Sequence, residues 1–566
     1  MSTEEQKKSD AYDRFDKMIT MMIASVAIWV AITVYFQNYA ANISEQARRR
    51  AQENAIAATK RELNGTIQSS YEWQGAFQTW REIGLQITAA DQSGDKAAVE
   101  RYTRLQERIA SLGEMLGPEY FDSIIGWPDT YKYEADTYLV ESTRLNEIYF
   151  AESELGRATD ETADSLVVQI TLLTVALSLY GLSTTLKGNV RWLFVIIGSG
   201  IVGLCVLWLS WSMIELLARP EVNTSAINAY SEGVGLAHQQ KYDEAIAKFN
   251  FAVAEKPDYG KAYYQRGFAN FDKNDISAAI KDFESAREAG FDSTNTNWNL
   301  GWAYYISGQF QKGIETDERV LNQDPRILGV RMNEAITYLS MGDLTNSQKQ
   351  YDLLIQEAER QVNEARNNNT QPSASLWFYM DAGTIDLRNL IDQLESNPKP
   401  WTEAPTANMI SGDHTVIRDF AFQQMVRLKE TIVALEYTGQ LPTAQEVMQV
   451  QPFAFGQITG TDEQGLVTNF EVSPNASFPY TTESVTVEYS YSGPPPQQVI
   501  WKVYSNGVED QSLRVVSNED MSSNSVWYRT FGYDYTNVFV LTPGEYVVEL
   551  YADSKLVQTG TFHIEE

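Results

Sequence analysis

Several kinds of residue are scarce in this sequence of 566 residues. Cys205 is its one cysteine, so no disulfide can form within the chain. Its three histidines, His238, His414 and His563, lie far apart and show no metal-ligand spacing. The G-x-S-x-G, H-E-x-x-H, P-loop and C-x-x-C motifs are also missing. We therefore expect no catalytic residues, no metal and no cofactor, and we predict that the protein is not an enzyme.

Positive charge is also scarce. The chain holds 44 Lys and Arg residues against 75 Asp and Glu residues, giving a net charge of −31. Binding to phosphate backbones requires clustered cations, so nucleic acid is excluded as a partner. One acid beside a histidine, Asp413 before His414, could suggest chemistry, but a helix start with Asp413 as its cap explains the pair better. The chain is too long for a single core, so several domains are expected.

Side chains of similar size recur every 34 residues between about 226 and 354. Two of the series hold mainly small residues, and two hold mainly large ones. The small series are Gly233, Gly267, Gly301, Ala335 and Ala245, Ala279, Gly313, Ser347. The large series are Tyr242, Ile276, Phe310, Leu344 and Phe249, Phe283, Asp317, Tyr351. Chance can produce one such series, but not four in register.

This pattern resembles the tetratricopeptide repeat (TPR), a pair of amphipathic helices with a period of about 34 residues. The first repeat fits best, with Gly233, Tyr242, Ala245, Phe249 and Pro257 all at the positions that the family pattern requires. The third repeat departs from it with an aspartate at an aromatic position, and the fourth is degenerate and is expected to cap the array. We predict a TPR array over 223–366, whose stacked pairs leave one concave surface.

The resemblance implies a partner-binding groove on the first helix of each repeat. The matching positions give an aromatic groove made of Tyr230, Tyr264, Phe268, Phe271, Trp298, Trp302 and Tyr305. The Lys/Asn clamp that holds a carboxylate in chaperone-binding TPR domains is missing, so a C-terminal carboxylate ligand is disfavoured. Aromatic anchors suit an apolar helix or a Pro-rich segment. Alternatively, a later helix of the chain itself, such as 376–395, fills the groove.

Three uncharged apolar runs, at 18–36, 165–186 and 192–214, are each long enough to cross a hydrocarbon core of about 30 Å. The third holds Ser199 and Gly203, a small-xxx-small pair, with Gly198 and Gly200 beside it, so this span is expected to pack closely on the second. The loop 187–191 carries Lys187 and Arg191 without an acid, and the leader 1–17 carries Lys7, Lys8, Arg14 and Lys17, which predicts that both lie in the cytoplasm. The chain would then be a multi-pass protein of the cytoplasmic membrane, with everything after the third span outside the cytoplasm. The inverted orientation remains the alternative, because Arg48–Arg50 oppose the first one.

The region 37–164 between the first two spans is predicted to be an extracytoplasmic helical domain. A long helix is expected to continue the first span to about residue 90, with Tyr71, Trp73, Phe77 and Trp80 packing on the returning helices. The Ala-rich helix after the first span, together with the segment 176–208, resembles a family of bacterial membrane proteins of unknown function. That resemblance implies no activity. A ligand pocket among the aromatic residues would instead make the protein a sensor.

After the repeats, additional helices are predicted over 375–440 and a β-sandwich over 453–566. Trp501 on an early strand and Tyr546 after a Pro-Gly turn resemble an immunoglobulin-like sandwich, in which Tyr546 would be the tyrosine-corner residue. The family's disulfide is absent. Asn506-Gly507 is a candidate hairpin turn. The predicted strands are 486–491, 498–504, 526–530, 538–541, 545–551 and 555–564.

The fold class that emerges is multidomain and mainly α, with three transmembrane helices, a helical stalk and a TPR solenoid, followed by an all-β domain. The predicted function is a membrane-anchored scaffold that recruits or organises envelope or membrane proteins. Its expected partners are a protein segment and the lipid bilayer, with a homo-oligomer left open. A sensor or receptor using 37–164 is the alternative function, and an envelope enzyme is the least favoured.

Overall fold

The computed structural model describes residues 3–122, 126–219, 221–395, 403–441, 448–462, 466–480, 482–517, 526–532 and 541–565. Two compact units make up the chain. The first contains Met1–Ala278 with Glu288–Phe291, and the second contains Ala279–Arg287 with Asp292–Glu566. Their boundary falls within α10 (Ile276–Glu288). Each unit is described by itself.

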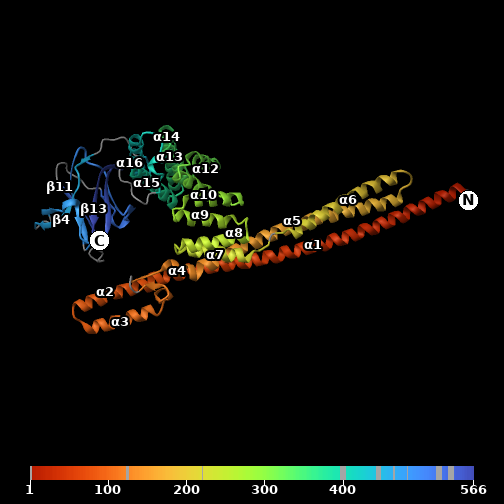
Figure 1. Ribbon diagram of the computed structural model, residues 1–566, viewed down its shortest axis with the longest axis horizontal. Coiled ribbons are helices and arrows are strands. Elements are labelled where there is room, and N and C mark those ends of the chain that lie inside the picture. Colours follow the sequence, from red (N-terminus) through yellow and green to blue (C-terminus); the bar gives the residue numbers. More distant parts are fainter. Residues whose placement is uncertain are drawn as a thin grey trace. The chain divides into compact units, whose positions relative to one another are not determined.

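Two very long helical runs form the frame of the first unit. The first run is α1 (Thr3–Tyr71), a π-helical turn (Glu72–Phe77) and α2 (Gln78–Gln92), after which α3 (Lys96–Ala110) folds back beside α2. The second run is α4 (Thr130–Glu134), another π-helical turn (Ala135–Leu139) and α5 (Val140–Thr185). Figure 1 shows α1 and α5 running side by side along much of their length. The predicted long helix up to residue 90 is therefore confirmed.

Small residues on α1 allow α5 to approach closely. Ala51, Ala58, Gly65 and Ser69 are all buried on one face of α1. A Cβ at Gly65 would overlap the ring of Tyr138 in the second helical run. Ser44 Oγ donates to the backbone oxygen of Gly156 over 2.9 Å in the same interface. This face of α1 is thus fully used by its partner within the chain.

Among the described residues, three helices are long and apolar enough to cross a membrane by length and composition: α1, the run ending in α5, and α6 (Val190–Leu217). The hydroxyls of Tyr180 on α5 and Ser199 on α6 lie 3.0 Å apart, and Gly198 lies against the Tyr180 ring. The expected packing on this helix is therefore confirmed for Ser199 and Gly198. A Cβ at Gly200 or Gly203 would meet nothing within 4 Å, so these two glycines do not take part in the contact.

The aromatic cluster of the helical region is confirmed except for one member. Trp73, Phe77 and Trp80 pack together with Phe121 and Trp127. Tyr71 was also expected to pack inward, but it is exposed. The reason is its helical phase. Ser69 faces the second run, so Tyr71, two residues later, points to the opposite side of α1.

Helices α7 (Thr224–His238), α8 (Tyr242–Glu255) and α9 (Gly260–Asp272) form the repeats of the first unit. Gly233 allows α7 to approach the ring of Phe249 on α8, as the repeat pattern requires. Helix α5 also contacts these repeat helices. Glu147 on α5 accepts hydrogen bonds from Tyr259 Oη (2.9 Å) and Lys261 Nζ (2.6 Å).

The second unit continues the helical array. Its helices are α11 (Thr294–Ile306), α12 (Phe310–Gln323), α13 (Leu328–Ser340), α14 (Leu344–Asn367), α15 (Ala374–Leu394) and α16 (His414–Tyr437). Nearly every residue of α13 is buried, and α15 and α16 pack beyond it. The fourth repeat is therefore interior and does not cap the array. The carboxylate of Asp413 accepts hydrogen bonds from the first backbone N–H groups of α16, which confirms its predicted role as a cap.

Two sheets around one core form the C-terminal all-β region. One sheet has the order β10-β8-β12-β13-β6, and the other has the order β11-β7-β4-β5. Side chains of both, including Val487, Trp501 and Phe562, share one core. Asn506 and Gly507, at φ 49° and 87°, turn the chain from β8 to β9 as predicted. The strands are β3 (Gln449–Val450), β4 (Ala454–Thr461), β5 (Val467–Val472), β6 (Ser477–Phe478), β7 (Ser484–Ser492), β8 (Val499–Ser505), β9 (Val508–Glu509), β10 (Val515–Ser517), β11 (Val526–Gly532), β12 (Gly544–Ala552) and β13 (Lys555–Ile564).

The sequence pattern missed β4 and β5. Only Phe455 and Gly456 of β4 are buried and no residue of β5 is, so neither strand shows a series of large core-facing side chains that would mark it in the sequence. The predicted strand at 538–541 falls outside the described residues except for Leu541, which belongs to the core.

Candidate functional site

The aromatic groove positions of the second unit lie beneath a helix of the same chain. The rings of Trp298 on α11 and Tyr379 on α15 meet edge to face, with their centroids 4.9 Å apart. Trp302 Nε1 donates to Glu403 Oε2 over 3.2 Å. Tyr305 is fully buried in the core that Met380 of α15 shares. In the described part of this unit, α15 and the segment after it thus cover the predicted groove residues.

The covering helix fits closely because glycine removes a side chain at the crossing. A Cβ at Gly383 of α15 would overlap the end of the Met332 side chain on α13. Leu376, Leu387 and Leu390 of α15 enter the same core. Burial, reinforced by Glu403, raises the pKa of Asp386 on α15 to about 8, so this carboxyl is largely neutral at pH 7. Asp386 therefore adds little charge to the occupied groove at this pH.

The groove positions of the first unit are less covered. Tyr230 is buried against Phe249 and Tyr259 and belongs to the core of the repeat. Phe268 on α9 is 36% exposed, and Phe271 is half-buried. Tyr264 packs its ring on Phe268 and on Phe291 at 5.3 and 5.4 Å between centroids. These three α9 residues form an accessible aromatic patch, which we call the α9 patch.

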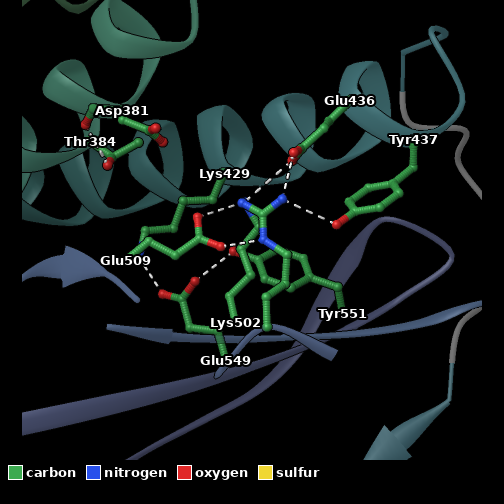
Figure 2. Close-up of polar contacts among 10 residues, drawn as sticks. Asp381, Thr384, Lys429, Glu436, Tyr437, Lys502, Glu509, Glu549 and Tyr551 are labelled. Atoms are coloured by element: carbon green, nitrogen blue, oxygen red, sulfur yellow. Dashed lines mark hydrogen bonds and ion pairs between the residues drawn. The ribbon is translucent and has the colours of Figure 1, made fainter. Parts of the chain in front are cut away.

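A second feature, which the sequence analysis did not identify, joins α16 to the β-sheets through buried charges (Figure 2). Lys429 on α16 forms an ion pair with Glu549 on β12, and Tyr551 Oη donates to Glu549 over 2.6 Å. Lys502 on β8, which is 2% exposed, donates to Glu509 over 3.2 Å. We call this set, with Arg514 and Glu436, the charged junction.

Arg514 ties the two sides of the charged junction together. Its Nε donates to Glu509 Oε1 over 2.6 Å, and its Nη1 donates to Glu436 Oε1 on α16 over 2.5 Å. Beside these ion pairs, Val433, Ile500 and Tyr551 form an apolar contact. Polar and apolar contacts together attach α16 to the sheets. Because the charged groups of the junction pair with one another within the chain, its role is structural.

The sequence did contain a signal for the charged junction. Lys502 interrupts an otherwise apolar run in β8, and Glu549 does the same in β12. A charge at the centre of an apolar strand is rarely buried unless it is paired. That pattern could have shown that two buried charges need partners, but not that α16 supplies some of them.

Comparison with known proteins supports the repeat and little beyond it. No protein-family model matches the chain. The chain is 28% identical over 127 residues to Hsp70-Hsp90 organizing protein 3 of Arabidopsis thaliana, covering 22% of this chain and 23% of that protein. It is 28% identical over 102 residues to Photosystem I assembly protein Ycf3 of Prochlorococcus marinus, covering 18% of this chain and 58% of that protein. The chain thus spans less than two thirds of either relative.

Among solved structures, YrrB, described as a TPR protein with an unusual peptide-binding site, is 18% identical and covers 29% of this chain and 82% of its own. Its TM-score of 0.23 does not establish a common overall fold. Neither curated relative is, by name, an enzyme. The sequence similarity supports a TPR-like helical repeat in this chain.

Proposed function

We propose that this protein is a membrane-anchored scaffold that holds a protein partner on its TPR-like repeats, outside the cytoplasm. The observation that carries the proposal is the combination in one chain of a TPR-like array with three helices apolar enough to span a bilayer. By their names, the two curated relatives organise or assemble other proteins. An anchored array would perform such organisation at a membrane surface.

The proposed orientation is supported by charge and by packing in the first unit. Lys187 and Arg191 flank the loop between α5 and α6. The guanidinium of Arg191 lies 3.9 Å from the centre of the Phe15 ring on α1. The leader and the basic loop are therefore at the same end of the three helices. The positive-inside rule, which counts Lys and Arg, favours the cytoplasm for that end, because the leader carries Lys7, Lys8, Arg14 and Lys17. The repeats follow the third helix and so belong on the other side.

Protease accessibility of a C-terminal tag tests this proposal. We expect the tag to be cleaved on intact cells, or on spheroplasts where an outer membrane is present, while a tag before residue 3 is protected until lysis. Protection of the C-terminal tag with cleavage at the N-terminus would invert the orientation and place the repeats in the cytoplasm. Recovery of the chain in the soluble fraction after lysis would contradict membrane anchoring altogether.

For partner binding we propose the α9 patch as the open part of the groove. In the second unit the partner would have to compete with α15, because that helix packs on Trp298 and Tyr305. An amphipathic helix or Pro-rich segment suits either surface, since aromatic side chains anchor such ligands.

Alanine at Tyr264 and Phe268 is expected to weaken partner capture by about 30-fold or more, the effect of losing a hot spot of about 2 kcal/mol. The measurement is quantitative co-purification with the full-length chain, followed by binding of the identified partner. Phe251→Ala is the matched control, because Phe251 on α8 is a comparably exposed phenylalanine (49%) outside the predicted groove. Equal capture by the unchanged chain, the double alanine variant and Phe251→Ala would exclude the α9 patch as the binding surface.

We further propose that the C-terminal sheets form an immunoglobulin-like sandwich. Trp501 is fully buried between the sheets. Tyr546 Oη donates to the backbone oxygen of Thr542 over 3.1 Å, the contact expected of a tyrosine corner. These two features support the resemblance although the family's disulfide is absent.

A further inference from the structure

The first unit carries large apolar side chains on the side of α1 that has no neighbour within the described part of that unit. Ile56, Leu63, Ile67 and Tyr71 are 70%, 57%, 59% and 73% exposed. Single exposed apolar residues are common, but four in a row on one helix face mark an interaction surface. We call this set the α1 stripe.

The α1 stripe lies opposite the face that contacts α5. Each helical residue advances by about 100°, so Leu63 and Ile67 point about 160° away from Gly65. The α5-facing side is built from small residues, whereas the stripe is built from large ones. A helix with one neighbour should be polar on its outer face. Here the larger apolar side chains are on the outer face, so α1 is suited to a second neighbour.

The stripe is straight and has both protruding and hollow parts. Ile56 and Ile67 are 11 residues apart, a spacing of about 3.67 residues per turn that keeps side chains on one side of an undistorted helix. A hollow of about 450 Å³ lies around Ile56 and Leu63 and is also lined by Ala55, Thr59, Lys60 and Asn64. A second, of about 600 Å³, lies around Ile67 and Tyr71 and reaches Gly75. Such a face can accept side chains of another helix between its own.

We propose that the α1 stripe is a dimer interface that binds the same stripe of a second copy of this chain, parallel and in register. The inference rests on the membrane anchoring proposed above. Because α1 continues without a break from its apolar segment, two copies in one bilayer carry the stripe at the same height and in the same direction. A second copy is therefore the one partner that presents a matching apolar face at that level.

Charge favours this like-to-like contact over the part of the stripe from Leu63 to Tyr71. These residues contain no acidic or basic side chain, so two identical faces meet there without repulsion. Lys60 lies on the same face between Ile56 and Leu63, so the contact is expected to be closest beyond it. From Ile56 to Tyr71 the stripe spans 16 residues, roughly 22 Å of helix. Two such stripes with their flanks bury on the order of 1,000 Å², which is at the lower end of specific interfaces. Confinement to a membrane raises the local concentration and makes so modest an area sufficient.

Cysteine cross-linking of the full-length chain in membranes tests the proposal. Cys205 is buried and is the only cysteine, so Cys205→Ala gives a cysteine-free background. We expect Leu63→Cys and Ile67→Cys each to form a reducible species of twice the 63.9 kDa chain on mild oxidation. Arg61→Cys is the matched control, since Arg61 is also exposed but points about 160° away from Leu63. Its cross-linking should be at least about fivefold weaker.

A second variant separates a specific interface from random collision. Adding Leu63→Lys to Tyr71→Cys should remove the Tyr71 cross-link, because two lysines would then face each other in the interface. Equal cross-linking at Arg61 and Leu63, no cross-link at any stripe position, or a dominant adduct with another protein would each overturn the proposal. Fractionation of the same sample tests membrane anchoring separately from dimerisation through the α1 stripe. A soluble chain refutes the anchoring, while the cross-link pattern still decides whether two stripes meet.

Discussion

The Glu549→Ala variant is expected to unfold with a free energy about 3–5 kcal/mol lower than the unchanged protein, the usual loss when one member of a buried ion pair is removed. The substitution leaves the Lys429 ammonium in a site that is almost closed to water. It also deprives the buried Tyr551 hydroxyl of its acceptor. Urea denaturation, followed by circular dichroism and by tryptophan fluorescence, measures the loss.

Two further variants show whether the charge itself is responsible. The exposed pair of Arg418 and Asp419 is the control, and Arg418→Ala should cost less than about 1 kcal/mol. Combining Lys429→Met with Glu549→Met and Tyr551→Phe should recover most of the loss, because no charge or hydroxyl then remains unpaired. A triple variant as unstable as Glu549→Ala would show that packing, and not the unpaired charge, accounts for the effect.

The second large effect is a loss of stability with rising pH, caused by two buried acids in the helices of the second unit. Asp317 on α12 is fully buried, and neither of its carboxyl oxygens has a hydrogen-bond partner among the described residues. Glu334 on α13 is also buried and accepts a hydrogen bond from Gln350 over 3.1 Å. Burial, with Glu318 adding to it, raises the pKa of Glu334 to about 7. Burial and Glu334 together raise the pKa of Asp317 well above its ordinary value.

The direction of this pH effect follows from the number of protons that the folded and unfolded chains bind. Between the ordinary pKa of 4.5 and about 7, folded Glu334 keeps a proton that the unfolded chain has already released. The free energy of unfolding therefore falls as the pH rises through this window, by roughly 3 kcal/mol from Glu334. Asp317 and Asp386 contribute in the same direction, because the pKa of each carboxyl is also raised in the folded chain.

Urea denaturation at pH 5, 7 and 9 checks this expectation. The Asp317→Asn, Glu334→Gln variant should lose less stability than the unchanged protein between pH 5 and 9, with the remaining slope due partly to Asp386. Asp419→Asn, at an exposed acid, should leave the slope unchanged. Stability that is constant or rises from pH 5 to 9 in the unchanged protein would contradict the argument.

Asp317 also shows what could be predicted from the sequence. Helix pairs follow from the 34-residue period because close helix crossings require small residues such as Gly233, and a core requires rings such as Phe249. Asp317 occupies the position of those rings, and the sequence marked it as a departure without giving its consequence. That consequence depends on burial and on Glu334, which lies on the next helix.

The covered groove was foreseen only as one of two alternatives. The pattern identified Trp298, Trp302 and Tyr305 as groove positions and 376–395 as a candidate to fill the groove. Which alternative holds depends on the fit of Gly383 against Met332, a contact between residues far apart in the sequence. The charged junction was missed for the same reason, because Lys429 and Glu549 lie 120 residues apart. Whether the aromatic positions bind a partner stays a prediction.

The hydrogen bonds that Tyr259 and Lys261 donate to Glu147 also hold the first repeat at a fixed position along α5. Glu147 precedes the predicted start of the second span at Ser165 by 18 residues of unbroken α5 helix, which corresponds to about 27 Å. With α5 standing in the bilayer, the first repeat would be held at a set elevation above the lipid. The length of α5 would then set the height of the α9 patch above the bilayer. Only neighbouring membrane proteins whose binding sites lie at that height could reach the patch.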